Sequence, residues 1–147
     1  MSAISIVSAN MKKNEPDREM FREFHGNPPA TEFLIRKIQK EGHVTLPSDY
    51  VEFLQKMDGG EGFIGPNAYV ILWRVGELLD INKAYEVSDY APGLFLFGSD
   101  GGGEAFAFDM RLSSRPIVEV PFVGMDLNLI RPKGATFYEF LNLLANS

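Results

Sequence analysis

Two short segments rich in glycine and acidic residues limit how this chain can fold. The first, DGGEG at Asp58–Gly62, follows a stretch whose apolar residues recur with the spacing of one helix face. Because the residue after a helix often adopts a left-handed conformation, we expect Gly59 or Gly60 to be the C-cap. The second, SDGGGE at Ser99–Glu104, lies between two short runs of β-forming residues and is typical of a hairpin turn. The chain should therefore combine helices with antiparallel strands.

The remaining pattern predicts further elements of both kinds. Apolar residues at helical spacing indicate a helix capped by Thr31 that ends at Gly42, and a second helix that starts at Pro47. A closing helix is predicted at TFYEFLNLL, where Thr136 and Glu139 have the spacing of a capping box. The other predicted elements are a helix at Gly76–Ser88 and strands at Ala68–Trp73, Leu94–Phe97, Glu104–Asp109, Pro116–Phe122 and Asp126–Ile130.

These elements predict an α+β fold in a single domain. We expect an antiparallel or mixed sheet of about five to six strands, flanked by about four helices. Residues 1–29 match the pattern least, and we interpret them as an N-terminal extension with one short helix that begins at Pro16 and reaches Phe24. Residues 30–147 then form the α+β domain.

Composition narrows the cellular setting and the class of partner. The chain has no cysteine, which suits a reducing compartment, and its N-terminus has the charge order opposite to that of a signal peptide. No run approaches the roughly 20 apolar residues of a membrane span, so we expect a soluble cytoplasmic protein that does not bind membranes. The formal net charge of −6 argues against direct nucleic-acid binding and leaves a basic protein partner open.

Motifs that carry catalytic or metal-binding chemistry are missing from the sequence. His25 and His43 lack metal-ligand spacing, and no cysteine is present to complete a zinc site. Ser99 has Phe97 where a serine nucleophile elbow requires glycine. The glycines of the second segment are followed by Glu104 rather than by the lysine of a phosphate-binding loop. We therefore expect no catalytic residues, no metal and no cofactor.

The acidic residues of the two glycine segments leave three interpretations open. They can be solvated turn residues that accept hydrogen bonds from nearby backbone N–H groups, they can contact a basic partner, or they can form a catalytic carboxylate cluster. The residues are Asp58, Glu61, Asp100 and Glu104. Trp73, the only tryptophan, fits either core packing or an anchor at a protein interface.

The order of these segments resembles the SUKH superfamily, which contains fungal cell-wall synthesis regulators and many bacterial relatives. The resemblance spans about Thr31–Leu144 and depends on LPSDYVEFLQKMDGGEG, the strand that leads through Trp73 to ELLDINKAYEV, GLFLFGSDGGGEAFAFDM and the closing TFYEFLNLL. It implies an α+β fold with a sheet flanked by helices and no known catalytic residues. For bacterial members it implies an immunity protein that binds and neutralises a toxin domain, often a nuclease.

The expected function is therefore a non-enzymatic protein-binding module, an immunity protein whose acidic surface meets a basic toxin domain. The alternatives are a regulatory or scaffolding protein like the fungal members and a hydrolase that uses the acidic cluster. The sequence leaves the oligomeric state open. The predicted partner-binding residues are Asp58, Glu61, Trp73, Glu77, Asp100 and Glu104.

Overall fold

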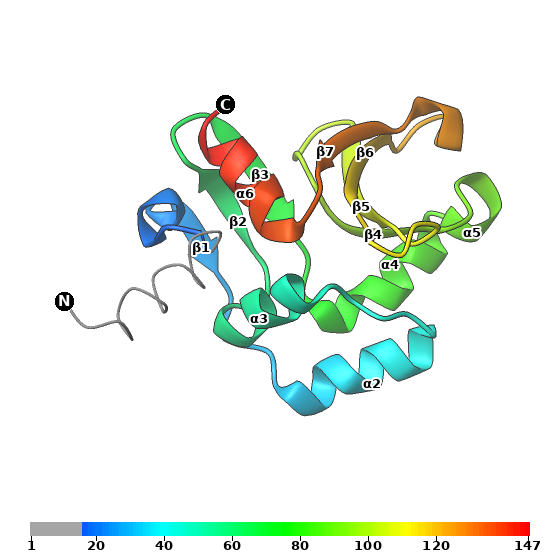
Figure 1. Ribbon diagram of the computed structural model, residues 1–147, viewed down its shortest axis with the longest axis horizontal. Helices are drawn as coiled ribbons and strands as arrows, with labels where there is room; N and C mark the ends of the chain where they lie inside the picture. Colours follow the sequence, from blue (N-terminus) through cyan, green and yellow to red (C-terminus); the bar gives the residue numbers. More distant parts are fainter. Residues whose placement is uncertain (1–15) are drawn as a thin grey trace.

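One antiparallel sheet organises the computed structural model, which describes residues 16–147. Its seven strands are adjacent in the order in which they occur along the chain (Figure 1). The predicted α+β fold with an antiparallel meander is confirmed, with slightly more strands than expected. The strands are β1 (Phe24–Gly26), β2 (Gly60–Ile64), β3 (Ala68–Leu72), β4 (Leu94–Ser99), β5 (Glu104–Asp109), β6 (Ile117–Pro121) and β7 (Arg131–Gly134).

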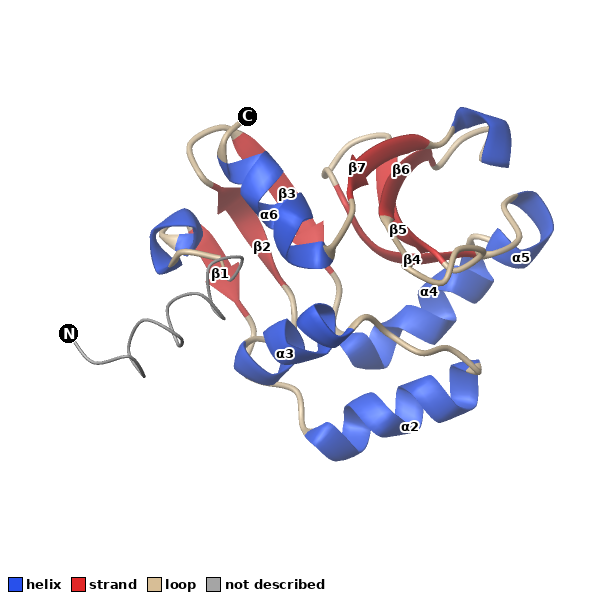
Figure 2. Ribbon diagram, viewed as in Figure 1, coloured by secondary structure: helices blue, strands red, loops and turns tan. Residues whose placement is uncertain are grey.

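The helices begin where the sequence provides caps. Thr31 Oγ1 accepts a hydrogen bond from Leu34 N at 3.1 Å, and Thr136 Oγ1 accepts one from Glu139 N at the same distance, as the capping spacing predicts. Figure 2 shows the helices at the margins of the sheet and across it. The α-helices are α2 (Glu32–Gly42), α3 (Ser48–Lys56), α4 (Leu78–Ala84), α5 (Val87–Tyr90) and α6 (Phe137–Ala145), and the 3-10 helices are η1 (Arg18–Phe21), η2 (Val75–Glu77) and η3 (Leu127–Leu129).

An aromatic cluster forms the main core, between one face of the sheet and helices α3 and α6. Tyr50 of α3 lies 4.9 Å, between ring centroids, from both Phe108 of β5 and Phe137 of α6. Phe97 of β4 stacks on Phe108 at 4.4 Å and meets Phe140 edge-on at 5.6 Å. All five rings are buried, so this cluster joins the two helices to the middle of the sheet.

The opposite face of the sheet is covered over only part of its width. Leu94 and Leu96 of β4, together with small and β-branched residues of β5 and β6, form a second core with Val87 and Ala91 of the α5 region and Met125. On β2 and β3, however, Glu61, Phe63 and Tyr69 on this face are exposed. The boundary coincides with the short β3–β4 pairing, which has only two registered pairs, Ile71↔Ser99 and Leu72↔Gly98.

The first glycine segment builds a strand, which the sequence interpretation missed. The C-cap of α3 is Met57, in an extended conformation, and not Gly59 or Gly60 as predicted. Gly59 adopts a φ of 71°, and Gly60 is already the first residue of β2. Gly60 and Gly62 allow the backbone of β1 to approach closely, because a Cβ on Gly62 would lie 2.4 Å from Glu23 O.

Other predicted elements differ because local polar contacts override strand or helix patterns. The strand predicted at Asp126–Ile130 is instead η3, since Asp126 Oδ1 accepts a hydrogen bond from Asn128 N at 2.8 Å and turns the chain. The helix predicted over Gly76–Ser88 breaks after α4, where Glu86 adopts a φ of 53°. The short N-terminal helix is present as η1, but Phe24 belongs to β1. The first fifteen residues of the predicted extension lie outside the described residues.

Replacing Gly62 by alanine should destabilise the protein by about 1–3 kcal/mol, because the added Cβ meets the backbone of Glu23 and a φ of 139° disfavours any side chain. Urea unfolding monitored by circular dichroism measures the change. Gly103→Ala is the matched control, since a Cβ there has no atom within 4 Å, and it should stay within about 0.5 kcal/mol of the wild type. Equal losses for both variants would contradict the close-approach explanation.

Candidate functional site

The uncovered part of the sheet presents a row of polar and aromatic side chains. His25 of β1 pairs with Glu61 of β2, and Glu61 pairs with Ile71 of β3, so these three side chains lie in line on one face. Phe63 and Tyr69 form the next pair, with 41% and 37% of their surfaces exposed. We call His25, Glu61, Phe63, Tyr69 and Ile71 the open sheet face. Exposed aromatic residues on a sheet are typical of protein contact surfaces.

Tyr69 joins the apolar and acidic parts of this face. Its ring meets that of Phe63 edge-on, with centroids 5.4 Å apart and the planes at 78°. Its hydroxyl donates a short hydrogen bond to Glu61 Oε2. This hydrogen bond raises the pKa of Tyr69 above its ordinary value, because the carboxylate favours the protonated phenol. The face thus combines a fixed aromatic pair with an acidic group.

Three of the six predicted partner-binding residues converge at one edge of the open sheet face. Glu61, Trp73 and Glu77 line a shallow pocket of about 390 Å³, which His25 and Arg74 also line. Glu77 is held in place because its Oε1 accepts a hydrogen bond from Arg74 N at 3.2 Å. Trp73 is half-buried and packs against both cores, and it also lines the pocket.

Asp58 lies beneath this pocket and is buried rather than available to a partner. Its Oδ1 accepts a hydrogen bond from Val75 N at 2.8 Å, and its backbone oxygen accepts one from Asn27 Nδ2 at 3.0 Å. Burial raises the pKa of Asp58, against the opposing effect of the Val75 N–H. Asp58 therefore holds the start of η2, and with it Glu77, next to β2.

The second acidic segment borders the open sheet face at Tyr69. A Cβ placed on Gly101 would lie 3.0 Å from the ring of Tyr69, so the β4–β5 turn lies directly beside that ring. Asp100 stabilises the turn, since its Oδ1 accepts hydrogen bonds from Gly102 N at 2.8 Å and from Glu104 N at 3.2 Å. Asp100 and Glu104 are half-buried. The two glycine segments, about 40 residues apart along the chain, thus flank one surface.

Over residues 16–147, the structure brings together no group of three or more histidine or acidic side chains able to hold a metal ion. Of the four acids of the glycine segments, Glu61 lines this pocket together with Glu77, whereas Asp58 accepts a hydrogen bond from Val75 N and does not line it. Within the same range, no helix has the length and apolar character needed to cross a membrane.

Sequence reasoning missed His25, Phe63, Tyr69 and Arg74 of this region. A signal for Phe63 was present, because GEGFI alternates exposed Glu61 and Phe63 with buried residues, the pattern of a half-buried strand. The three glycines nearby concealed it, since glycine disfavours strands.

Asp58→Asn should remove a buried charge and keep an oxygen that accepts from Val75 N. Because folding raises the pKa of Asp58, the folded protein holds this proton at a higher pH than the unfolded chain, whose pKa is about 3.9. The stability that protonated Asp58 gives the wild-type protein is therefore lost as the pH rises through the pKa of Asp58 in the folded state. We expect the free energy of unfolding of Asp58→Asn, relative to wild type, to increase from pH 4 to pH 7 in urea titrations.

Asp58→Ala is the control, because it also leaves the N–H of Val75 without its acceptor. It should be about 1–3 kcal/mol less stable than Asp58→Asn at every pH. A stability difference between Asp58→Asn and wild type that does not change with pH would contradict the assigned burial of the charge.

Comparison with known proteins is consistent with the fold and with the sequence resemblance. No match to a curated protein is found. The profile of the SMI1 / KNR4 family (SUKH-1) matches residues 29–143, which include β2 to β7, α2 to α5, most of α6 and both glycine segments. The chain belongs to the SMI1 / KNR4 family (SUKH-1).

Proposed function

We propose that this protein is a non-enzymatic immunity protein that binds and neutralises a basic toxin domain through the open sheet face and its acidic border. Membership of the SUKH-1 family supports an immunity or regulator-like module. The single observation that carries the choice of surface is the aromatic pair Phe63 and Tyr69, exposed beside Glu61 on a sheet face that is covered elsewhere.

The composition of this surface suits a protein partner. Aromatic residues that are held rigidly contribute much of the binding energy at interfaces, and Phe63, Tyr69 and Trp73 are fixed by strand pairing or core packing. Glu61 and Glu77 are exposed around them, and Asp100 lies in the adjacent turn. Together with the net charge of −6, these acids would attract a basic domain such as a nuclease and raise the association rate.

In this proposal the predicted residues have different roles. Glu61, Trp73 and Glu77 contact the toxin directly, and Asp100 and Glu104 shape the turn at the border of the interface. Asp58 does not contact the toxin and acts indirectly, because it positions the segment that carries Glu77. Neutralisation would take place in the cytoplasm, where a nuclease reaches its substrate.

A regulatory role through a stable cellular partner is the alternative, and the same family membership supports it. The two functions differ in their partners. An immunity protein protects cells only when the toxin is present, whereas a regulator should co-purify with a host protein from cells that lack the toxin.

Co-expression tests the immunity function. A toxin domain encoded beside this protein should arrest growth when expressed alone, and growth should recover when this protein is present. The two proteins should purify as a 1:1 complex of nanomolar or tighter affinity, as is usual for protective inhibitors. Growth arrest that persists in the presence of this protein would contradict the proposal.

Glu61→Lys combined with Glu77→Lys should lower the association rate with that toxin by about tenfold or more at low salt, and by less at high salt, where charges are screened. Stopped-flow fluorescence measures the rate. The control is Glu32→Lys with Glu41→Lys on α2, which changes the net charge equally at two exposed positions outside the open sheet face. Equal effects of the two double variants would show that net charge, and not this surface, steers binding.

A further inference from the structure

The open sheet face has the dimensions of one α-helix. It belongs to three neighbouring strands, β1, β2 and β3, which together span about 10 Å at the usual spacing between strands. β2 and β3 have five residues each, so they extend for about 17 Å. A helix with its side chains is about 10–12 Å wide, and about eleven helical residues have the same length as these strands. One helix of three turns would therefore cover this surface.

A helix also suits this surface because of its backbone. A segment that lies on the face of a sheet receives no backbone hydrogen bonds from it, since the N–H and C=O groups of the strands point toward neighbouring strands. Such a segment must satisfy its own backbone groups. A helix does so alone, whereas a strand needs further strands beside it. On the opposite face of this sheet, α3 and α6 form such a helical cover.

Aromatic rings are spaced along the open sheet face at the distance of helical turns. Tyr69 is near the start of β3 and Trp73 directly follows its end. Four strand residues separate them by about 13 Å, which two to three helical turns match. Trp73 extends the apolar surface further, because its ring centroid lies 6.4 Å from that of Phe122, which lies 4.8 Å from that of Tyr85. An apolar helix stripe would thus meet aromatic rings along its whole length.

The charges around these rings favour a basic helix. Glu61 and Glu77 are exposed and line the pocket at one end of the face, where Arg74 is a single opposing cation. At the other end, Asp100 lies in the turn that borders Tyr69. The net charge of −6 adds to this local excess of acid. Lysine or arginine side chains at the margins of a partner helix would be attracted to both ends.

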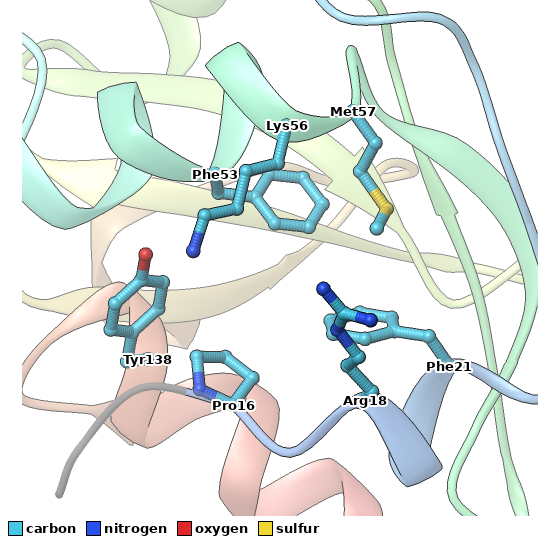
Figure 3. Close-up of a pocket in the computed structure, with 7 residues that line it drawn as sticks. All are labelled: Pro16, Arg18, Phe21, Phe53, Lys56, Met57 and Tyr138. Atoms are coloured by element: carbon cyan, nitrogen blue, oxygen red, sulfur yellow. The ribbon is translucent and has the colours of Figure 1, made fainter. Parts of the chain in front are cut away.

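The larger hollow on the other side of the sheet is a poorer match for such a helix. It has a volume of about 710 Å³ and lies between η1, α3 and α6. Figure 3 shows Arg18 and Lys56 among the side chains that line it, and none of the described residues that line it is acidic. A basic helix would approach cations there, so electrostatics favours the open sheet face.

We propose, building on the toxin-binding function proposed above, that the partner places one basic amphipathic helix of about three turns on the open sheet face. The apolar stripe of this helix packs on Phe63, Tyr69 and Trp73, and its cationic side chains reach Glu61 and Glu77. The helix extends over β1 to β3 the layer that α5 and the segment around Met125 form over β4 to β6.

Two synthetic peptides of about 14 residues, with the same content of leucine, alanine and lysine, serve as probes. The first has leucine at i, i+3, i+4 and i+7, and the second alternates apolar residues with lysine, so only the first forms an amphipathic helix. Isothermal titration calorimetry on the full chain should show at least tenfold tighter binding of the first peptide. Its amide NMR shifts should centre on β1 to β3 and Trp73.

Equal or tighter binding of the alternating peptide would overturn the proposal, because it would show that charge alone, or a strand, occupies the face. No binding of either peptide, or shifts confined to another region, would overturn it as well. A wild-type dimer in sedimentation that Phe63→Ser with Tyr69→Ser converts to a monomer would assign the face to a second copy of the chain and also overturn it.

Phe63→Ser with Tyr69→Ser should weaken binding of the helical peptide at least tenfold, because the aromatic pair on which the helix packs is lost. Both side chains are exposed, so the fold should persist, and the amide NMR spectrum checks this. The matched control is Phe33→Ser with Tyr90→Ser, which replaces the same residue types at exposed positions on α2 and α5 and should leave the affinity unchanged. Equal weakening by both double variants would overturn the assigned surface.

The peptide measurements require no toxin, so the helix and the proposed function can fail separately. A toxin complex on the open sheet face, together with failure of the helical peptide to bind, would keep the function and overturn the helix. Selective binding of the helical peptide to this face, without protection from the toxin, would support the helix and contradict the immunity function.

Discussion

The packing of Tyr50, Phe97 and Phe137 against one another holds two helices on the middle of the sheet. These three rings come from α3, β4 and α6, whose positions in the sequence are far apart, and their centroids lie 4.9–5.7 Å from one another. The contact joins α3 and α6 to the middle of the sheet. α3 and β4 each lead directly into one of the two glycine segments.

The two faces of the sheet are covered differently, and this difference explains where the candidate surface lies. On the aromatic side, α3 and α6 cover the sheet and leave a cavity where η1 meets them. On the other side, α5 and the segment around Met125 cover only β4 to β6. On β2 the exposed residues are Glu61 and Phe63, whereas Gly60 and Gly62 alternate with them and are buried. An aromatic, acid-bordered surface remains exposed.

Asp58 illustrates how tertiary context changes the meaning of an acidic residue. In the sequence it is one of four acids beside turn glycines. In the structure it is buried, it accepts a hydrogen bond from Val75 N, and its negative charge adds to the effect of burial in raising the pKa of Tyr50 well above its usual range. A buried carboxyl group costs stability unless it is satisfied by hydrogen bonds. The hydrogen bond from Val75 N to the carboxylate of Asp58 joins the end of α3 to the start of η2.

Elements whose signals are local can be predicted from the amino-acid sequence. The capped helices α2 and α6, the stripe of α3 and the β4–β5 hairpin all depend on contacts within about one to three turns of chain, and their order was sufficient to identify the family. Long-range contacts make Gly60–Ile64 a strand, since its glycines allow the close approach of β1 and have no strand preference of their own. It alone also placed Glu61, Trp73 and Glu77 around one pocket and buried Asp58 beneath it. The physical reason is that strand register and helix packing are long-range contacts, and no local pattern specifies which side chains they bring together.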